Sequence, residues 1–230
     1  MAELMLSSIN GTRTINSETY AGQTYNLLRT AILKHELKEG EVYSQDQVSA
    51  MLNISRTPVR EALLALQKEG YVRFLRGRGF EVVAYDTKDA MNIAETRLIV
   101  EKAAARLAAQ RVREEQILTM EKNLNMQQVC VENKNMFDVQ FYLQLDDSFH
   151  LQILEASSNN HLYKITEDMR SQWIRVGYSI LQYSENRLDI YHEHQKIFNA
   201  IKARDGEAAE QAMELHMSNT QKRHLAKGSG

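Results

Sequence analysis

The sequence predicts an all-α protein with a small β wing, organised as an N-terminal domain at residues 15–84 and a C-terminal domain at residues 87–226. Two patterns carry this prediction. Apolar residues before residue 84 recur first at helical spacing and then in strand-like alternation, as in a helical domain that ends in a hairpin. Apolar residues after residue 87 recur only at helical spacing, and the single proline, Pro58, lies far upstream of them. The second domain is therefore expected to be entirely helical.

Three short helices are expected in the first domain. Apolar residues repeat at helical spacing between 18 and 34, which predicts the first helix. Ser44 can cap a second helix at 45–52, because its hydroxyl can accept a hydrogen bond from the first backbone amides. Ser55 can cap a third helix in the same way, and Pro58 falls in its first turn, where a missing N–H costs nothing.

A hairpin is expected after the third helix, which should end near Glu69. The stretches 71–75 and 80–83 alternate in strand fashion on either side of the glycine-containing turn at 76–79. Three helices with a tight turn between the second and third, followed by a hairpin, form a winged helix-turn-helix, whose third helix lies in the major groove of DNA. The first domain is therefore predicted to bind double-stranded DNA.

The predicted base contacts are Arg56 and Arg60, which are four residues apart and so share one face of the third helix. Each guanidinium can donate two hydrogen bonds to O6 and N7 of guanine. Ser55 and Thr57 are expected to hold phosphate oxygens together with the amides of the helix start. The further candidate DNA contacts are Ser44, Arg76, Gly77 and Arg78. The alternative interpretation is a solvated helix face whose arginines pair with Glu61.

The charge distribution favours DNA binding over a solvated face. The chain has a formal net charge of −2, which argues against a nucleic-acid binder held by overall charge alone. Between Ser55 and Arg78, however, six lysines and arginines stand against two glutamates, a local excess of four positive charges. The positive charge is thus concentrated on the segment that is predicted to contact DNA.

Six amphipathic helices are expected in the second domain. Their approximate ranges are 88–110, 113–131, 135–157, 161–181, 184–203 and 206–225. Successive helices joined by short loops pack as an antiparallel bundle, in which facing side chains can build a metal or ligand site.

Four side chains of the second domain could converge on a metal. Asp146 and His150 are four residues apart on one expected helix, and His194 and His216 lie on the apolar faces of two others. Nitrogen and oxygen donors of this kind suit a divalent transition metal. Histidines on apolar helix faces are more often hydrogen-bonded core groups than ligands, so the spacing alone leaves both interpretations open.

The first domain resembles the GntR family of bacterial regulators. The resemblance rests on Ser55-Arg56-Thr57-Pro58-Val59-Arg60-Glu61-Ala62-Leu63, Leu66, Glu69-Gly70-Tyr71-Val72 and Arg78-Gly79-Phe80. One departure concerns Asp46, which stands early in the second helix, where family members often carry a basic DNA contact.

The second domain resembles the FCD ligand-binding domain that follows GntR-type DNA-binding domains, and its six helices are similar to the VanR-type subgroup. The matching residues are Arg97, Glu101, Asp146, Phe149, His150, Asn159, His194, Ala200, Ile201 and His216. The resemblance implies that Asp146 and the three histidines bind a divalent transition metal, zinc first, with nickel or manganese as alternatives. It also implies a small carboxylate effector bound near Arg97 and Asn159. The alternative for Arg97 is a structural ion pair with Glu101.

Together these patterns predict a cytoplasmic transcription regulator, because Met1 to Asn10 lacks the charged-then-apolar pattern of a secretory signal and no run of about eighteen apolar residues occurs. We expect a homodimeric repressor that binds a short palindromic operator and responds to a small organic acid at or near the metal. One alternative is a direct sensor of the metal itself. The other is a metallohydrolase that uses the same four side chains, although no acid or base near them is singled out by its helical position.

Overall fold

The computed structural model describes residues 19–84, 87–133, 138–181, 183 and 185–227. By its backbone contacts the chain divides into two compact units. The first runs up to Lys68 and includes Val72–Val82, and the second consists of Glu69–Tyr71 and the chain from Val83 onward. Each unit has its own core.

In its described residues, the body of the first unit consists of three helices: α2 (Tyr20–Leu33), α3 (Gln45–Leu52) and α4 (Arg56–Lys68). Thr19 caps α2 by accepting a hydrogen bond from the amide of Gly22, and α3 begins with a capping box at Ser44. The apolar face of α4 packs against α2 and buries Leu63 completely. The three expected helices are therefore present, and Ser44 caps the second of them.

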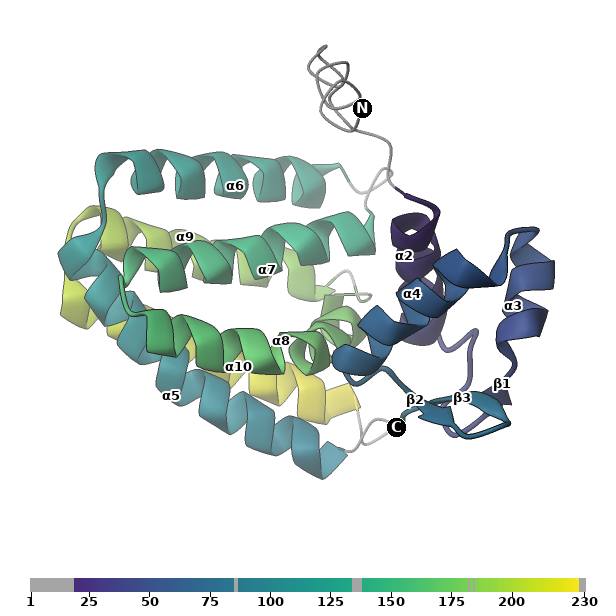
Figure 1. Ribbon diagram of the computed structural model, residues 1–230. Coiled ribbons are helices and arrows are strands. Elements are labelled where there is room, and N and C mark those ends of the chain that lie inside the picture. The colour runs from purple at the N-terminus through teal and green to yellow at the C-terminus, as the bar shows by residue number, and fades with distance from the viewer. Residues whose placement is uncertain (1–18, 85–86, 134–137, 182, 184, 228–230) are drawn as a thin grey trace, which may run out of the picture. The chain divides into compact units, whose positions relative to one another are not determined.

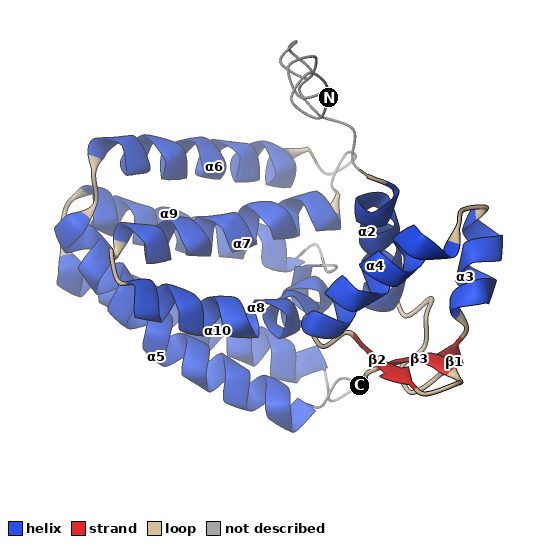
Figure 2. Cartoon of the chain, viewed as in Figure 1, coloured by secondary structure: helices blue, strands red, loops and turns tan. Residues whose placement is uncertain are grey.

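The first unit also holds a small antiparallel sheet, with the strand order β1-β3-β2 (Figure 2). Its strands are β1 (Val42–Tyr43), β2 (Val72–Leu75) and β3 (Gly79–Val82). Phe80 of β3 lies opposite Phe74 of β2 and Tyr43 of β1. The expectation of a two-stranded wing was wrong in the number of strands, since a strand of two residues is too short to show alternation.

Gly79 is the residue that lets β1 join the sheet. Its φ of +108° is unfavourable for other residues, and a Cβ there would lie 2.1 Å from the carbonyl oxygen of Tyr43. Only glycine allows the two backbones to approach this closely.

Six antiparallel helices form the second unit (Figure 1). They are α5 (Thr87–Arg111), α6 (Glu114–Glu132), α7 (Val139–Ala156), α8 (Asn160–Leu181), α9 (Glu185–Lys202) and α10 (Gly206–Lys227). The central helix is α5, which packs against α7, α8, α9 and α10. Its alanines Ala104, Ala105, Ala108 and Ala109 are fully buried, and such small side chains allow helices to pack closely. The predicted fold class, all-α with a wing and a six-helix bundle, is confirmed.

Among the described helices, none is long and apolar enough to span a bilayer.

Candidate functional site

Three histidines from three helices meet inside the bundle. His150 comes from α7, His194 from α9 and His216 from α10, and one ring nitrogen of each lies within 4.8 Å of the others. All three are buried, and His194 is fully inaccessible to solvent. The structure thus brings together three of the four side chains that the sequence singles out as metal ligands.

Asp146, the fourth candidate, lies beside the histidines. It is one turn before His150 on α7 and is 7% exposed, and its Oδ1 is 3.6 Å from Nε2 of His194. Burial raises the pKa of Asp146, and the nearby His150, His216 and Arg97 only partly offset this effect. A buried carboxylate in this position calls for a cation beside it.

The hydrogen bonds around His194 determine which of its nitrogens carries the proton. Asn123 donates from Nδ2 to the carbonyl oxygen of Leu145 (3.0 Å), so its Oδ1 is free to accept from Nε2 of Gln127 (2.7 Å). Gln127 therefore presents Oε1 to Nδ1 of His194, at 2.8 Å. An amide oxygen only accepts, so Nδ1 of His194 carries the proton and Nε2 holds a lone pair.

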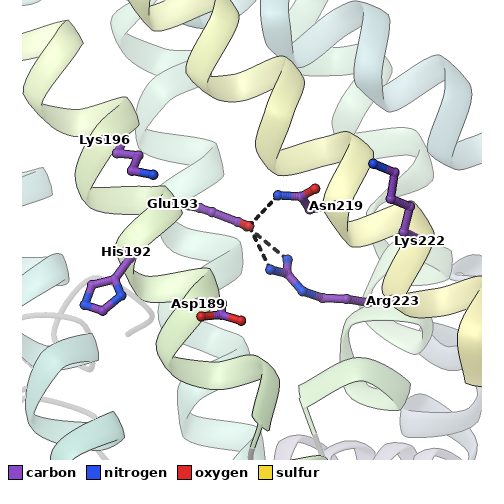
Figure 3. Close-up of a pocket in the computed structure, with 7 residues that line it drawn as sticks. All are labelled: Asp189, His192, Glu193, Lys196, Asn219, Lys222 and Arg223. Carbon is purple, nitrogen blue, oxygen red and sulfur yellow. Dashed lines mark hydrogen bonds and ion pairs between the residues drawn. The ribbon is translucent and has the colours of Figure 1, made fainter.

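Carboxylates hold the other two histidines in the same way. Glu101 of α5 contacts Nδ1 of His150, and Glu193 of α9 contacts Nδ1 of His216 at 2.8 Å (Figure 3 shows the other partners of Glu193). Burial would raise the pKa of each glutamate, but the charges and hydrogen bonds around it lower that pKa to about 2. Because both are ionised acceptors, Nδ1 of each histidine donates and Nε2 is left as the ligand atom.

Two of the imidazoles, those of His194 and His216, also favour the neutral form that a metal ligand must have. Burial lowers the pKa of His194 well below its usual value, and the neighbouring His216 and His150 lower it further. Burial is also the main cause of the lowered pKa of His216, partly offset by Glu193. A metal would therefore have few protons to displace from these two histidines at neutral pH.

One atom tests whether the site fits a metal. Nε2 of His194 is buried and has no hydrogen-bond partner among the described residues. A buried polar atom without a partner is unusual in a folded protein. Its lone pair faces the carboxylate of Asp146, an arrangement that a bound cation would stabilise. The donor set of three imidazoles and one carboxylate matches the preferences of zinc and its neighbours in the transition series.

Arg97 lies next to this cluster on α5. It is 2% exposed, contacts Glu101 through Nε, and its guanidinium carbon lies 4.1 Å from the centre of the Trp173 ring. The ion pair with Glu101 that the sequence suggested is therefore present. Nη1 of Arg97 has no partner within the described structure, which leaves one buried donor for a ligand.

Asn159 has a role that the sequence did not suggest. It precedes α8, and its Oδ1 accepts hydrogen bonds from the amides of His161 (3.2 Å) and Leu162 (3.4 Å). The side chain therefore caps α8. Its proposed contact with an effector stays a prediction.

The sequence did not single out Gln127 and Glu193, and it gave Glu101 only as a partner of Arg97. The sequence does hold a pattern that could have pointed to Gln127, because Asn123 and Gln127 are four residues apart among apolar residues of α6. Both are buried in the structure. A polar pair on a buried helix face needs a partner on another element.

The candidate DNA contacts of α4 lie on the surface of the first unit. Ser55, Arg56, Thr57 and Arg60 are all exposed. Arg56 donates from Nε to Oδ1 of Asp46 on α3, at 2.6 Å, and both side chains are largely exposed. The sequence did not predict this ion pair. It brings the Arg56 side chain next to the start of α3.

The wing tip presents the second group of candidates. Arg76, Gly77 and Arg78 are exposed, and Gly77 has a φ of +71° with no atom near the position of a Cβ. Ser44 is half-buried and accepts a hydrogen bond from the amide of Asp46 (3.1 Å) as the cap of α3. These residues lie where a winged helix-turn-helix can contact DNA, and their roles in DNA binding stay predictions.

Comparison with known proteins agrees with both units. Residues 20–82 match the family model described as "Bacterial regulatory proteins, gntR family", and residues 92–219 match the model of the FCD domain. The chain is 30% identical over 211 residues to the "HTH-type transcriptional repressor RspR" of Escherichia coli K12, covering 92% of this chain and 89% of the relative. It is 27% identical over 236 residues to the "Uxu operon transcriptional regulator" of the same organism, covering 92% and 90%.

A solved structure shares the fold. The structure titled "E. coli McbR/YncC" superposes with a TM-score of 0.70 at 20% sequence identity, over 91% of this chain and 98% of that one. The two family models together span most of the described residues, and the relatives are named as regulators of transcription. The chain therefore belongs to the GntR family of DNA-binding transcription regulators and carries an FCD domain behind its winged helix-turn-helix.

Proposed function

We propose that this regulator is a homodimeric repressor that binds a short palindromic operator and leaves it when a small carboxylate enters the bundle beside a divalent metal. The observation that supports it best is the set of three buried histidines, each with Nδ1 held by an acceptor and Nε2 left as a ligand atom. The relative RspR is named as a repressor, which favours repression over activation.

In the proposed site, Asp146, His150, His194 and His216 hold zinc, nickel or manganese. The ion supplies a positive charge and coordination positions for an oxygen ligand. Arg97 is placed to donate from its unpaired Nη1 to the carboxylate of the effector. The carboxylate therefore has two sources of positive charge, and both are buried.

The metal proposal is tested by equilibrium binding. Chelator-treated protein is titrated with Zn²⁺, Ni²⁺ and Mn²⁺ in competition with a chromophoric chelator, alongside His150→Ala, His194→Ala and the surface control His161→Ala. One tight site per chain that both buried substitutions abolish and His161→Ala leaves intact is the expected result. Equal affinity in all variants would exclude the site.

The effector is sought by thermal shift. Sugar acids, dicarboxylates and hydroxy acids are screened with and without metal, since a ligand that binds the native state raises its stability. We expect hits that depend on both the metal and Arg97. If chelation and metal refeeding alone release and restore DNA binding, the protein is a direct metal sensor.

The DNA contacts are tested on Arg60, which forms no ion pair among the described residues. Selection from a random DNA pool defines the operator of the wild type. Arg60→Ala should then lose preference at one guanine, at a cost of about 1–3 kcal/mol. Lys68→Ala, at the other end of α4, is the control because it removes the same charge far from the helix start. Full retention of sequence preference by Arg60→Ala would refute the assignment.

A further inference from the structure

A pocket distinct from the histidine cluster lies between α9 and α10, with a volume of about 500 Å³ (Figure 3). Its lining consists of Asp189, His192, Glu193 and Lys196 from α9 and of Asn219, Lys222 and Arg223 from α10. The volume is in the range of pockets that bind small molecules. The polar and charged character of these side chains favours a charged ligand.

Glu193 connects this pocket to the histidine cluster. On the pocket side its carboxylate accepts from Nη1 and Nη2 of Arg223, at 3.0 and 2.7 Å, and from Nδ2 of Asn219 at 2.8 Å. On the inner side it accepts from Nδ1 of His216 at 2.8 Å. One buried carboxylate is thus shared between a pocket arginine and a candidate metal ligand.

The upper end of the pocket in Figure 3 carries the unbalanced positive charge. Arg223 and Glu193 balance each other, whereas Lys196 and Lys222 form no ion pair within the described part of the chain. Asp189 is seven residues before Lys196 on α9, about 10 Å away along the helix axis. A negatively charged group therefore finds its best position between the two lysines and Arg223.

We propose that this pocket binds a small oxyanion, a carboxylate or a phosphate, between Lys196, Lys222 and Arg223. The anion draws Arg223 away from Glu193. Among the described residues, Glu193 then keeps only the hydrogen bonds from Asn219 and His216, so it accepts more strongly from His216, whose Nε2 becomes a stronger ligand atom. Binding in the pocket is independent of the proposed function, while the link to metal affinity rests on it.

Anion binding is measured first, on metal-free protein, with succinate and inorganic phosphate as separate probes. Thermal shift is followed at constant ionic strength, with sodium chloride as the balancing salt. A saturable shift is expected with at least one probe, and the comparison of the two shows which oxyanion the pocket accepts. Lys196→Gln and Lys222→Gln should each weaken binding about fivefold, the value of one favourable exposed ion pair.

Two further variants serve as controls. Lys202→Gln should change nothing, because Lys202 lies on the same helix but pairs with Glu121 at 2.9 Å. Asp189→Asn should tighten binding by about twofold, as expected for a charge about 10 Å away in water. The pocket is refuted if neither probe saturates, if the double variant of the two lysines binds as the wild type does, or if Asp189→Asn weakens binding.

The second measurement tests the link between the pocket and the metal site. It compares the affinity for Ni²⁺ with and without the anion that binds in the pocket. In the wild type, the anion should make Ni²⁺ binding several-fold tighter. In Arg223→Lys the anion should leave the Ni²⁺ affinity unchanged, because lysine cannot hold Glu193 with two parallel donors. Equal affinities in the wild type would refute the link and leave the pocket standing. A complete lack of Ni²⁺ binding would overturn the metal site and the link together, whereas the first titration still decides the pocket.

Discussion

The chain of hydrogen bonds from Asn123 through Gln127 to His194, called the relay below, offers the sharpest test of the proposed metal site. Of the four candidate ligands, the described structure hydrogen-bonds Gln127 to His194, and its Oε1 sets the tautomer of that histidine through the 2.8 Å bond to Nδ1. Gln127→Met keeps the length of the side chain and removes both its acceptor and its donor. His194 can then rotate or move its proton to Nε2, and either change removes a ligand atom from the cluster.

The expected losses of metal affinity and of stability in Gln127→Met follow from the groups that lose their hydrogen-bond partner. Loss of a partner that orients a metal-binding histidine costs about 10–100-fold in affinity, or about 1.4–2.7 kcal/mol. The metal-free protein should also be less stable, because Nδ1 of His194 and Oδ1 of Asn123 lose their partners, at about 1–3 kcal/mol each. The variant therefore has to be assayed at low temperature, where it stays folded.

The assay is competition for Zn²⁺ with a chromophoric chelator, after circular dichroism has shown that each variant is helical. Gln128→Met is the matched control, since Gln128 is the next residue on α6 and its Nε2 donates to Glu132 on the surface (2.8 Å). We expect wild-type affinity for the control. Zinc affinity within threefold of wild type in folded Gln127→Met would show that the relay does not orient a ligand.

Three other predictions concern the wing, the DNA contact of Arg56 and the dependence of stability on pH. Gly79→Ala should separate β1 from β3 and abolish DNA binding, whereas Gly77→Ala should cost only about 1–2 kcal/mol of stability, as measured by urea unfolding, because it meets no neighbouring atom. Asp46→Ala should leave Tm nearly unchanged, since an exposed ion pair contributes about 0–1 kcal/mol, but should broaden base preference where Arg56 reads DNA; an unchanged selected motif would contradict this. The free energy of unfolding of the metal-free protein should fall as pH falls below about 6.5, because His194 and His216 take up protons more readily in the unfolded chain than in the folded one. It should fall again between about 4.5 and about 2, because Glu101 and Glu193 have lowered pKa values in the folded chain. A rise in the free energy of unfolding below about pH 6 would contradict these lowered pKa values.

The fold was predictable because its elements are long or strongly signalled. Each helix of the bundle buries an apolar face whose period is visible within its own sequence, and Ser44 and Pro58 mark helix starts by local chemistry alone. The strand β1 has no such signal. It exists because Gly79, 36 residues after Tyr43, allows the two backbones to approach. Neither segment has a local sequence pattern that indicates this contact.

The site was predictable only in part, for the same reason. The histidines were found through spacing and a family resemblance, but their partners lie on other helices. Gln127 is 67 residues from His194 along the chain, and no local pattern connects them. Asp46 was noticed as a departure from the family, while its ion pair with Arg56 depends on how α3 and α4 are packed.

The partners of the three histidines also set the total charge of the buried cluster. Glu101, Glu193 and an ionised Asp146 bring three negative charges, and Arg97 and Arg223 bring two positive ones. The remaining charge is −1, which disfavours an anion. A divalent cation would change it to +1. Metal and organic acid would thus each raise the affinity of the other, so a cell short of the metal would respond to the acid only at higher concentrations.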